Sequence, residues 1–291
     1  MSTSILRVGL CGVGTVGLAT VHILRDQSAM LAARCGQTLS ITHVGARREV
    51  PHSDYATARI SRDVMDVARD PDVDVLVELI GGTTVARDLI KLAIEQGKHV
   101  MTANKALIAE HGNELILLAE QAGVQLRFEA AVAGGIPVIK TLREAMAANA
   151  VSEVAGIING TGNFILTEMT TKGRSYEDVL AEAQALGYAE ADPTADVEGL
   201  DAAAKVSIIA SIAFGCNVVA SDVYSEGISK ISAADIAIAK RLGYAVKLLA
   251  VAENDKSNGE ISVRVHPAMV PMHHPLASVR DSFNAVVVDG E

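Results

Sequence analysis

The chain has 291 residues, of which 49% are hydrophobic and 3% aromatic, with no tryptophan. This length can bury one large core or two modest ones, built from Ala, Val, Ile and Leu. The formal net charge of −10 argues against a nucleic-acid-binding protein, which needs a basic face, and against attraction to anionic membranes. The three cysteines are far apart and odd in number, so we expect no disulfide framework and a cytoplasmic location.

The first part of the chain alternates apolar runs with helical patterns. This alternation predicts right-handed crossovers and an α/β fold, a Rossmann-type doubly wound parallel sheet. Strands are predicted at residues 5–11, 39–46, 73–80, 98–102 and 124–128, and helices at 16–25, 85–96 and 107–122.

The pattern changes near residue 130, where we divide the chain into domains 1–130 and 131–291. The mixture of elements after this point predicts an α+β second domain. We expect helices at 138–148, 164–171, 176–186 and 200–214, strands at 151–158, 261–265 and 285–288, and a turn at 160–162.

A glycine-rich turn follows the first predicted strand and opens the first predicted helix. It reads Gly12-Val13-Gly14-Thr15-Val16-Gly17, which fits the GxGxxG pattern of dinucleotide-binding turns. Its glycines permit a tight turn, close backbone approach to a pyrophosphate, and close packing of the helix on the strand. The helix start supplies free N–H groups and partial positive charge. The motif therefore predicts that the first domain binds a dinucleotide.

The end of the second strand bears on which dinucleotide is bound. An acidic residue there would bind a ribose 2′-hydroxyl, but the strand runs instead into Arg47 and Arg48. Two guanidinium groups can bind a 2′-phosphate, which favours NADP over NAD. NAD remains open because Glu49 follows directly and can serve a 2′-hydroxyl.

Four further segments identify a family. They are Thr102-Ala103-Asn104-Lys105, residues 129–137, residues 159–166 and, most specific of all, residues 187–205. In these segments, and over essentially its whole length, the chain resembles the homoserine dehydrogenases. The resemblance implies an oxidoreductase that interconverts L-aspartate 4-semialdehyde and L-homoserine with NADP or NAD, on the way to threonine, isoleucine and methionine. It also implies a homodimer formed through the second domain.

The most specific segment is also the richest in charge. Five carboxylates crowd into twelve positions, and Asp201 is followed four residues later by Lys205, so both project from one face of a helix. The rest of that helix is apolar, and a lysine on a buried helix needs a partner or a function. A surface ion pair is the alternative. The resemblance favours function, because the family uses a lysine here for proton transfer.

The resemblance also implies roles for the other residues. An ammonium near the aldehyde oxygen stabilises developing negative charge and donates a proton, which we assign to Lys205, oriented by Asp201. We expect Lys105 to reach the nicotinamide and the substrate from the end of a sheet strand. Carboxylates can bind the α-ammonium of the substrate. The residues expected to bind substrate are Glu190, Thr161, Tyr188 and Asp196.

The turn near the domain boundary resembles the family's sodium site. There the Glu129 carboxylate and the backbone carbonyls of Val132, Gly134 and Ile136 would hold the ion, and hard oxygen ligands suit it. From the residues alone, this segment is only a glycine hinge.

The chain ends in a predicted strand entering a turn, where family members continue with a return segment and often a regulatory domain. We therefore expect a fragment that binds cofactor more weakly than an extended form. Two alternatives to the leading function stay open: an inactive cofactor-binding module, and a dehydrogenase of another semialdehyde or amino acid.

Overall fold

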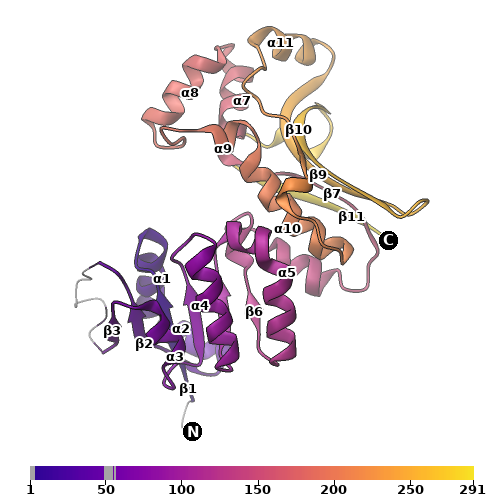
Figure 1. Ribbon diagram of the computed structural model, residues 1–291. Helices are drawn as coiled ribbons and strands as arrows, with labels where there is room; N and C mark the ends of the chain where they lie inside the picture. The colour runs from indigo at the N-terminus through magenta and orange to yellow at the C-terminus, as the bar shows by residue number, and fades with distance from the viewer. Residues whose placement is uncertain (1–3, 49–54, 56) are drawn as a thin grey trace. The chain divides into compact units, whose positions relative to one another are not determined.

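The computed structural model describes residues 4–48, 55 and 57–291. The chain folds into two compact units, residues 1–131 and 132–291, one residue away from the division drawn from the sequence. Each unit is built on its own β-sheet (Figure 1).

The first unit contains a six-stranded sheet in which every strand is parallel to its neighbours. The order is β3-β2-β1-β4-β5-β6, so the chain starts in the middle and winds outward in both directions, as in dinucleotide-binding folds. The predicted doubly wound sheet is confirmed. The strands are β1 (Ile5–Cys11), β2 (Thr38–Gly45), β3 (Arg59–Ser61), β4 (Val75–Glu78), β5 (His99–Thr102) and β6 (Leu126–Arg127).

The register of this sheet brings the carboxyl ends of its central strands level. Cys11 of β1 pairs with both Gly45 of β2 and Glu78 of β4, and Glu78 pairs with Thr102 of β5. Ligands bind outside the carboxyl ends in open sheets of this kind. The loops that leave these four residues therefore form the functional edge of the unit.

Helices connect the strands of the first unit. Short polar side chains begin two of them: Asp63 accepts the Met65 N–H at 2.9 Å, and Asn104 accepts the Leu107 N–H at 3.2 Å. The three helices predicted from the sequence match α1, α4 and α5 within two residues, whereas α2, α3 and β3 were missed. The helices are α1 (Thr15–Asp26), α2 (Ser28–Cys35), α3 (Val64–Arg69), α4 (Thr84–Glu95) and α5 (Lys105–Gln121).

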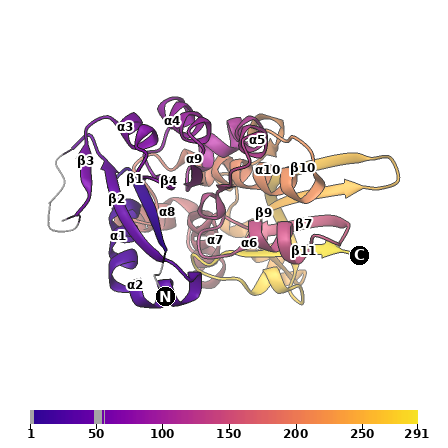
Figure 2. The same cartoon turned by 90° about the horizontal axis from the view of Figure 1, so that it is seen from below.

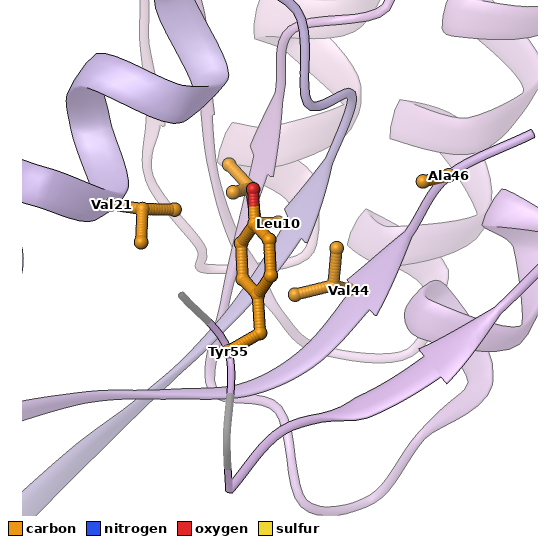
Figure 3. Packing of buried hydrophobic residues seen from close by; sticks show 5 residues of the cluster. All are labelled: Leu10, Val21, Val44, Ala46 and Tyr55. Carbon is orange, nitrogen blue, oxygen red and sulfur yellow. The ribbon is translucent and has the colours of Figure 1, made fainter. Parts of the chain in front are cut away.

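One core cluster of the first unit holds α1 against the sheet. Leu10 of β1 and Val44 of β2 are fully buried, and Val21 of α1 packs with them. The ring of Tyr55 lies among these three side chains (Figure 3). This packing fixes the start of α1, and with it the glycine turn, at the carboxyl end of β1.

The second unit contains a mixed five-stranded sheet, in the order β11-β7-β9-β10-β8. Only β8 pairs in parallel, and β9 and β10 form a long antiparallel hairpin that both views show clearly (Figures 1 and 2). The sequence predicted β7, β11 and part of β10 but missed β8 and β9. The strands are β7 (Val151–Ile157), β8 (Tyr224–Ser225), β9 (Tyr244–Asp255), β10 (Glu260–Pro271) and β11 (Ala285–Gly290).

The helices of the second unit agree with the sequence at α10 and, within one residue, at α8. The helix predicted at 138–148 ends early, as α6 followed by a π-helical turn η3. The turn predicted at 160–162 is wrong, because these residues form the first turn of α7. The elements are α6 (Val138–Lys140), η3 (Thr141–Ala145), α7 (Gly160–Lys172), α8 (Tyr176–Ala185), α9 (Thr194–Val197), α10 (Leu200–Phe214) and α11 (Ala233–Arg241).

Three short 3-10 turns complete the described elements: η2 (Glu129–Ala131), η4 (Ala220–Asp222) and η5 (Pro275–Ser278). Within the described residues, no helix combines the length and apolar character needed to cross a bilayer.

Candidate functional site

The three glycines of the GxGxxG turn meet three different requirements. Gly12 has φ of +99°, and a Cβ atom there would lie 2.5 Å from the Leu79 carbonyl oxygen. A Cβ atom at Gly17 would lie 2.1 Å from the Gly12 carbonyl oxygen, so that glycine lets α1 pack on the turn. A Cβ atom at Gly14 would meet nothing within 4 Å, and its φ of −73° suits any residue. Among the described residues, no contact requires glycine at position 14, and the backbone there is open to close approach by a ligand.

The start of α1 has free backbone donors. Gly14 is the residue before the helix and offers no side chain to cap it, and no acidic residue lies in the first turn. Thr15 and Val16 are exposed, and Val13 is half-buried. The first N–H groups of a helix lack intrahelical partners and carry partial positive charge. This end of α1 can therefore accept an anionic group such as a pyrophosphate.

Arg47 and Arg48 lie just beyond the carboxyl end of β2, with both side chains exposed. The Arg62 guanidinium donates a 2.9 Å hydrogen bond to the Arg47 carbonyl oxygen, which ties this segment to the chain after β3. Two cations therefore stand at the functional edge, where an acidic residue would accept a ribose hydroxyl. Glu49, the alternative partner for a 2′-hydroxyl, lies outside the described residues.

Lys105 is the first residue of α5, at the carboxyl end of β5, and its side chain is partly buried. Asn104 precedes it, caps α5 with Oδ1, and donates from Nδ2 to the Gly82 carbonyl oxygen at 2.7 Å. The backbone at Lys105 is therefore fixed from two sides on the same edge as the glycine turn.

In the second unit, Lys205 and Asp201 form the ion pair expected from their spacing. The Lys205 ammonium donates to Asp201 Oδ2 at 2.6 Å and to the Ile158 carbonyl oxygen at 2.8 Å. The two side chains are only 17% and 12% exposed, which excludes an ordinary surface pair. An ammonium has three donors, and the described residues take two of them. Its third N–H group has no acceptor among the described residues.

Asn159 completes this arrangement. Its Nδ2 donates to Asp196 Oδ1 at 2.7 Å and to Asp201 Oδ2 at 3.0 Å, while its Oδ1 accepts the Gly162 N–H and begins α7. The side chain is 5% exposed. We call Lys205, Asp201, Asn159 and Asp196 the lysine network.

No role was predicted for Asn159 from the sequence. The sequence does contain a signal for its capping role: an asparagine lies directly before Gly160-Thr161-Gly162, and asparagine is a preferred residue before the first turn of a helix.

Thr161 and Tyr188 are linked to each other beside the lysine network. The Thr161 hydroxyl donates to the Tyr188 carbonyl oxygen at 2.8 Å, two residues beyond Asn159 on α7. The Tyr188 ring is 49% exposed and lies 4.8 Å, centroid to centroid, from the Phe164 ring. An aromatic surface therefore adjoins the polar network.

The crowded carboxylates have separate surroundings. Asp192 accepts hydrogen bonds from the Thr194 N–H and hydroxyl, which lower the pKa of its carboxyl group and fix the start of α9. Asp196 and Asp201 belong to the lysine network. Glu190 is exposed on the segment that joins Tyr188 to Asp196, and among the described residues its carboxylate has no hydrogen-bond partner. Glu190 is thus available to a ligand but is not joined to Lys205.

The segment expected to bind sodium has an unusual backbone. Glu129 begins η2 and is partly buried. Ala133 has φ of +46° and Gly135 has φ of +90°, and Val132 is buried while Gly134 is exposed. A positive φ at alanine is uncommon and marks a turn held by its surroundings. Among the residues with described positions, no three His, Cys, Asp or Glu side chains gather as a metal centre.

Comparison with known proteins identifies the family. The model for the NAD-binding domain of homoserine dehydrogenase matches residues 12–129, and the homoserine dehydrogenase model matches residues 137–291. A homoserine dehydrogenase from Pseudomonas aeruginosa is 54% identical over 286 residues, covering 98% of this chain and 65% of its own length. The chain thus spans about two thirds of such curated relatives.

Solved structures agree with this match. The homoserine dehydrogenase of Thiobacillus denitrificans superposes with a TM-score of 0.93 at 46% identity, covering 99% of this chain and 67% of that one. A hyperthermophilic archaeal homoserine dehydrogenase, solved in complex with NADPH, shares the fold with a TM-score of 0.80 at 24% identity, covering 99% and 88%. Both domain models, the sequence relatives and the fold agree, and the chain belongs to the homoserine dehydrogenase family.

Proposed function

We propose that this chain catalyses the NADP- or NAD-dependent interconversion of L-aspartate 4-semialdehyde and L-homoserine, in the cytoplasm, on the way to threonine, isoleucine and methionine. The main support for this proposal is the lysine network: the shielded Lys205 ammonium is held by Asp201 and the Ile158 carbonyl oxygen, Asn159 holds Asp201, and one N–H group of the ammonium has no acceptor among the described residues. Membership of the family supports the same reaction.

The glycine turn supports binding of the nicotinamide dinucleotide. The pyrophosphate would lie against Gly14, where the fold leaves space beside the backbone, and would accept hydrogen bonds from the first N–H groups of α1. Arg47 and Arg48 would bind a 2′-phosphate, so the preferred cofactor is NADP, with NAD as the second choice. When bound, the cofactor supplies the hydride for reduction of the aldehyde.

The lysine network would donate the proton that the reduction requires. As the aldehyde carbon is reduced, negative charge develops on its oxygen, and the Lys205 ammonium stabilises that charge and donates a proton to form the hydroxyl. Asp201 and the Ile158 carbonyl oxygen hold two N–H groups of Lys205, so the third is directed without further ordering. Lys105, at the edge of the first sheet, would contact the nicotinamide and the substrate.

The amino-acid end of the substrate would be bound by the neighbouring polar groups. An α-ammonium needs carboxylates, which Glu190 and Asp196 provide. Thr161 and the exposed Tyr188 would line the same region. Because the Glu190 carboxylate has no hydrogen-bond partner among the described residues, the substrate ammonium would be its partner.

The proposal extends to a sodium ion. The Glu129 carboxylate and the carbonyl oxygens of Val132, Gly134 and Ile136 supply hard oxygen ligands, which suit such an ion, and its role would be structural. Sodium binding is tested by measuring activity and melting temperature in sodium chloride and in choline chloride. Higher values in sodium support it, and equal values contradict it.

The proposal also includes a homodimer. Ala155, Leu249 and Val287 are partly exposed apolar residues of the second sheet, and a second copy of the chain could cover them. Light scattering at several protein concentrations measures the mass directly. A monomer at high micromolar concentration would remove the dimer from the proposal.

The function is tested by following nicotinamide absorbance with L-homoserine and either NADP or NAD, side by side. We expect homoserine-dependent reduction of both, with the higher kcat/KM for NADP. L-Serine and L-threonine serve as other amino alcohols. Faster turnover of one of these would point to another dehydrogenase, and cofactor binding without turnover would point to an inactive module.

A further inference from the structure

Glu78 is a fully buried carboxylate at the functional edge of the first sheet, where it ends β4. Its Oε1 atom accepts the N–H groups of Ile80 at 2.8 Å and Gly81 at 3.1 Å, and its Oε2 atom accepts the Thr102 hydroxyl at 2.6 Å. Burial of a charged group is costly unless its hydrogen bonds are satisfied, and these three donors satisfy it. A nonpolar residue would fill the position at lower cost, so the carboxylate calls for an explanation beyond stability.

The Thr102 hydroxyl extends this contact to the next loop. Thr102 is 4% exposed, and its Oγ1 atom accepts the Asn104 N–H at 2.9 Å while its proton goes to Glu78. Asn104 returns to the first loop by donating from Nδ2 to the Gly82 carbonyl oxygen at 2.7 Å. The hydrogen bonds form a closed ring through Glu78, Thr102, Asn104 and the Gly81–Gly82 turn.

The ring stands between the two halves of the cofactor site. On one side, the loop that follows Glu78 packs against the glycine turn, since a Cβ atom at Gly12 would lie 2.5 Å from the Leu79 carbonyl oxygen. On the other side, Asn104 directly precedes Lys105 and caps its helix. In folds of this type β1 to β3 serve one mononucleotide half and β4 to β6 the other. The Thr102 side of the ring therefore belongs to the nicotinamide half.

We propose that Glu78 is a positioning residue that acts through Thr102, fixing the Asn104–Lys105 segment and the Gly81–Gly82 turn to receive the nicotinamide half of the dinucleotide. This inference rests on the proposed use of a nicotinamide cofactor. Its consequence is specific: loss of the Thr102 contact weakens binding of the intact dinucleotide but not of its adenosine half. The Oε1 contacts of Glu78, which support the loop beside the glycine turn, stay in place.

The test uses Thr102→Val, which keeps the shape of the side chain and removes the hydroxyl, and Thr102→Ser, which restores the hydroxyl. Dissociation constants are measured by calorimetry for NADP and for 2′,5′-ADP, which carries the adenosine half only. We expect Thr102→Val to raise the dissociation constant for NADP tenfold or more and that for 2′,5′-ADP less than twofold. Thr102→Ser should bind NADP with a dissociation constant within threefold of the wild-type value.

Two results overturn the proposal: equal weakening of both ligands, which would make the ring a general support of the unit, and no weakening of either. If Thr102→Val does not fold, Glu78→Gln is measured in the same way, because it keeps an acceptor at Oε1 and changes the partner of Thr102. These are binding measurements without substrate. A wild-type chain that binds NADP but fails to oxidise homoserine would contradict the proposed function and still leave this comparison decisive.

Discussion

Asn159 and Asp201 are joined by a 3.0 Å hydrogen bond from Nδ2 to Oδ2, across 42 positions of the chain. The same carboxylate oxygen accepts the Lys205 ammonium at 2.6 Å. Asn159 therefore links the start of α7 to the first turn of α10 and leaves Asp201 a single orientation in which to hold the lysine.

This relationship predicts that Asn159 supports turnover through its Nδ2 atom. Asn159→Asp keeps an acceptor for the Gly162 N–H but loses the donor and adds a third carboxylate. Asn159→Ala loses the helix cap as well, at a cost of about 1 kcal/mol of stability. We expect both to lower kcat for homoserine roughly 10- to 100-fold and both to lower the melting temperature, the alanine variant through the lost cap and the aspartate variant through the added buried charge.

The control for this pair is Asn258→Ala, in the turn between β9 and β10, where Glu260 is the hydrogen-bond partner of the side chain among the described residues. Its kcat should stay within twofold of wild type. Full activity of Asn159→Asp would show that the cap alone matters and that Asp201 needs no donor from Asn159.

Alanine substitutions at two glycines of the turn should have different effects, one on stability and the other on cofactor binding. Gly17→Ala places a Cβ atom 2.1 Å from the Gly12 carbonyl oxygen, so the fold loses about 1–3 kcal/mol or more. Gly14→Ala places its Cβ atom in open space, so stability changes by less than about 0.5 kcal/mol. We expect Gly14→Ala to weaken NADP binding tenfold or more, measured by calorimetry beside thermal melts. Unchanged affinity in Gly14→Ala would place the pyrophosphate elsewhere.

Arg47 and Arg48 are expected to set the choice of cofactor. Hydrogen bonds to a charged group contribute about 1.5–3 kcal/mol, so their joint replacement by alanine should lower kcat/KM for NADP tenfold or more. The value for NAD should change less than threefold, because NAD lacks the 2′-phosphate. Arg34→Ala, exposed in the last turn of α2, serves as the surface control. Equal loss with both cofactors would contradict a phosphate-binding role.

A buried lysine outside the lysine network makes stability depend on pH. Lys247 of β9 is 4% exposed and donates to Asn163 Oδ1 and to the Val279 carbonyl oxygen. Burial, together with the charge of Arg280 and against the opposing charge of Asp281, lowers the pKa of Lys247 from 10.5 to about 8. Between these two pH values the unfolded chain binds the proton that the folded chain has released. The free energy of unfolding therefore rises with pH across that window.

Lys247→Met removes this dependence together with the two hydrogen bonds. In urea unfolding at pH 7, 8, 9 and 10, the free energy of unfolding of the wild type should rise relative to that of the variant above pH 8, by at most about 1.4 kcal/mol per pH unit. A difference that stays constant from pH 7 to pH 10 would mean that Lys247 keeps its ordinary pKa in the folded chain.

The sequence predicted best where a feature depends on local spacing. Helix α10 was predicted at its observed bounds because Gly199 and Gly215 flank a mainly apolar stretch, and the Asp201–Lys205 pair follows from helical periodicity. Contacts between residues far apart in the chain could not be predicted from local spacing. The bond between Glu78 and Thr102 spans 24 positions, and only the register of β4 and β5 brings these residues together.

Two errors have identifiable causes. Gly160 and Gly162 suggested a turn, but Asn159 caps the helix and overrides the low helical preference of glycine. Strand β9 was missed because its first nine residues form an almost continuous apolar run, and such a run lacks the alternation that distinguishes a strand from a helix. Pairing with both β7 and β10 decides between them.

Lys205→Ala is the sharpest test of whether the Lys205 ammonium donates the proton to the substrate oxygen. The rate of homoserine-dependent NADP reduction is measured beside the NADP dissociation constant, with Lys172→Ala, an exposed partner of Glu168, as the control. We expect a fall in kcat of roughly 100- to 10,000-fold, with NADP affinity unchanged within twofold. A kcat within tenfold of the wild-type value would contradict this role of Lys205.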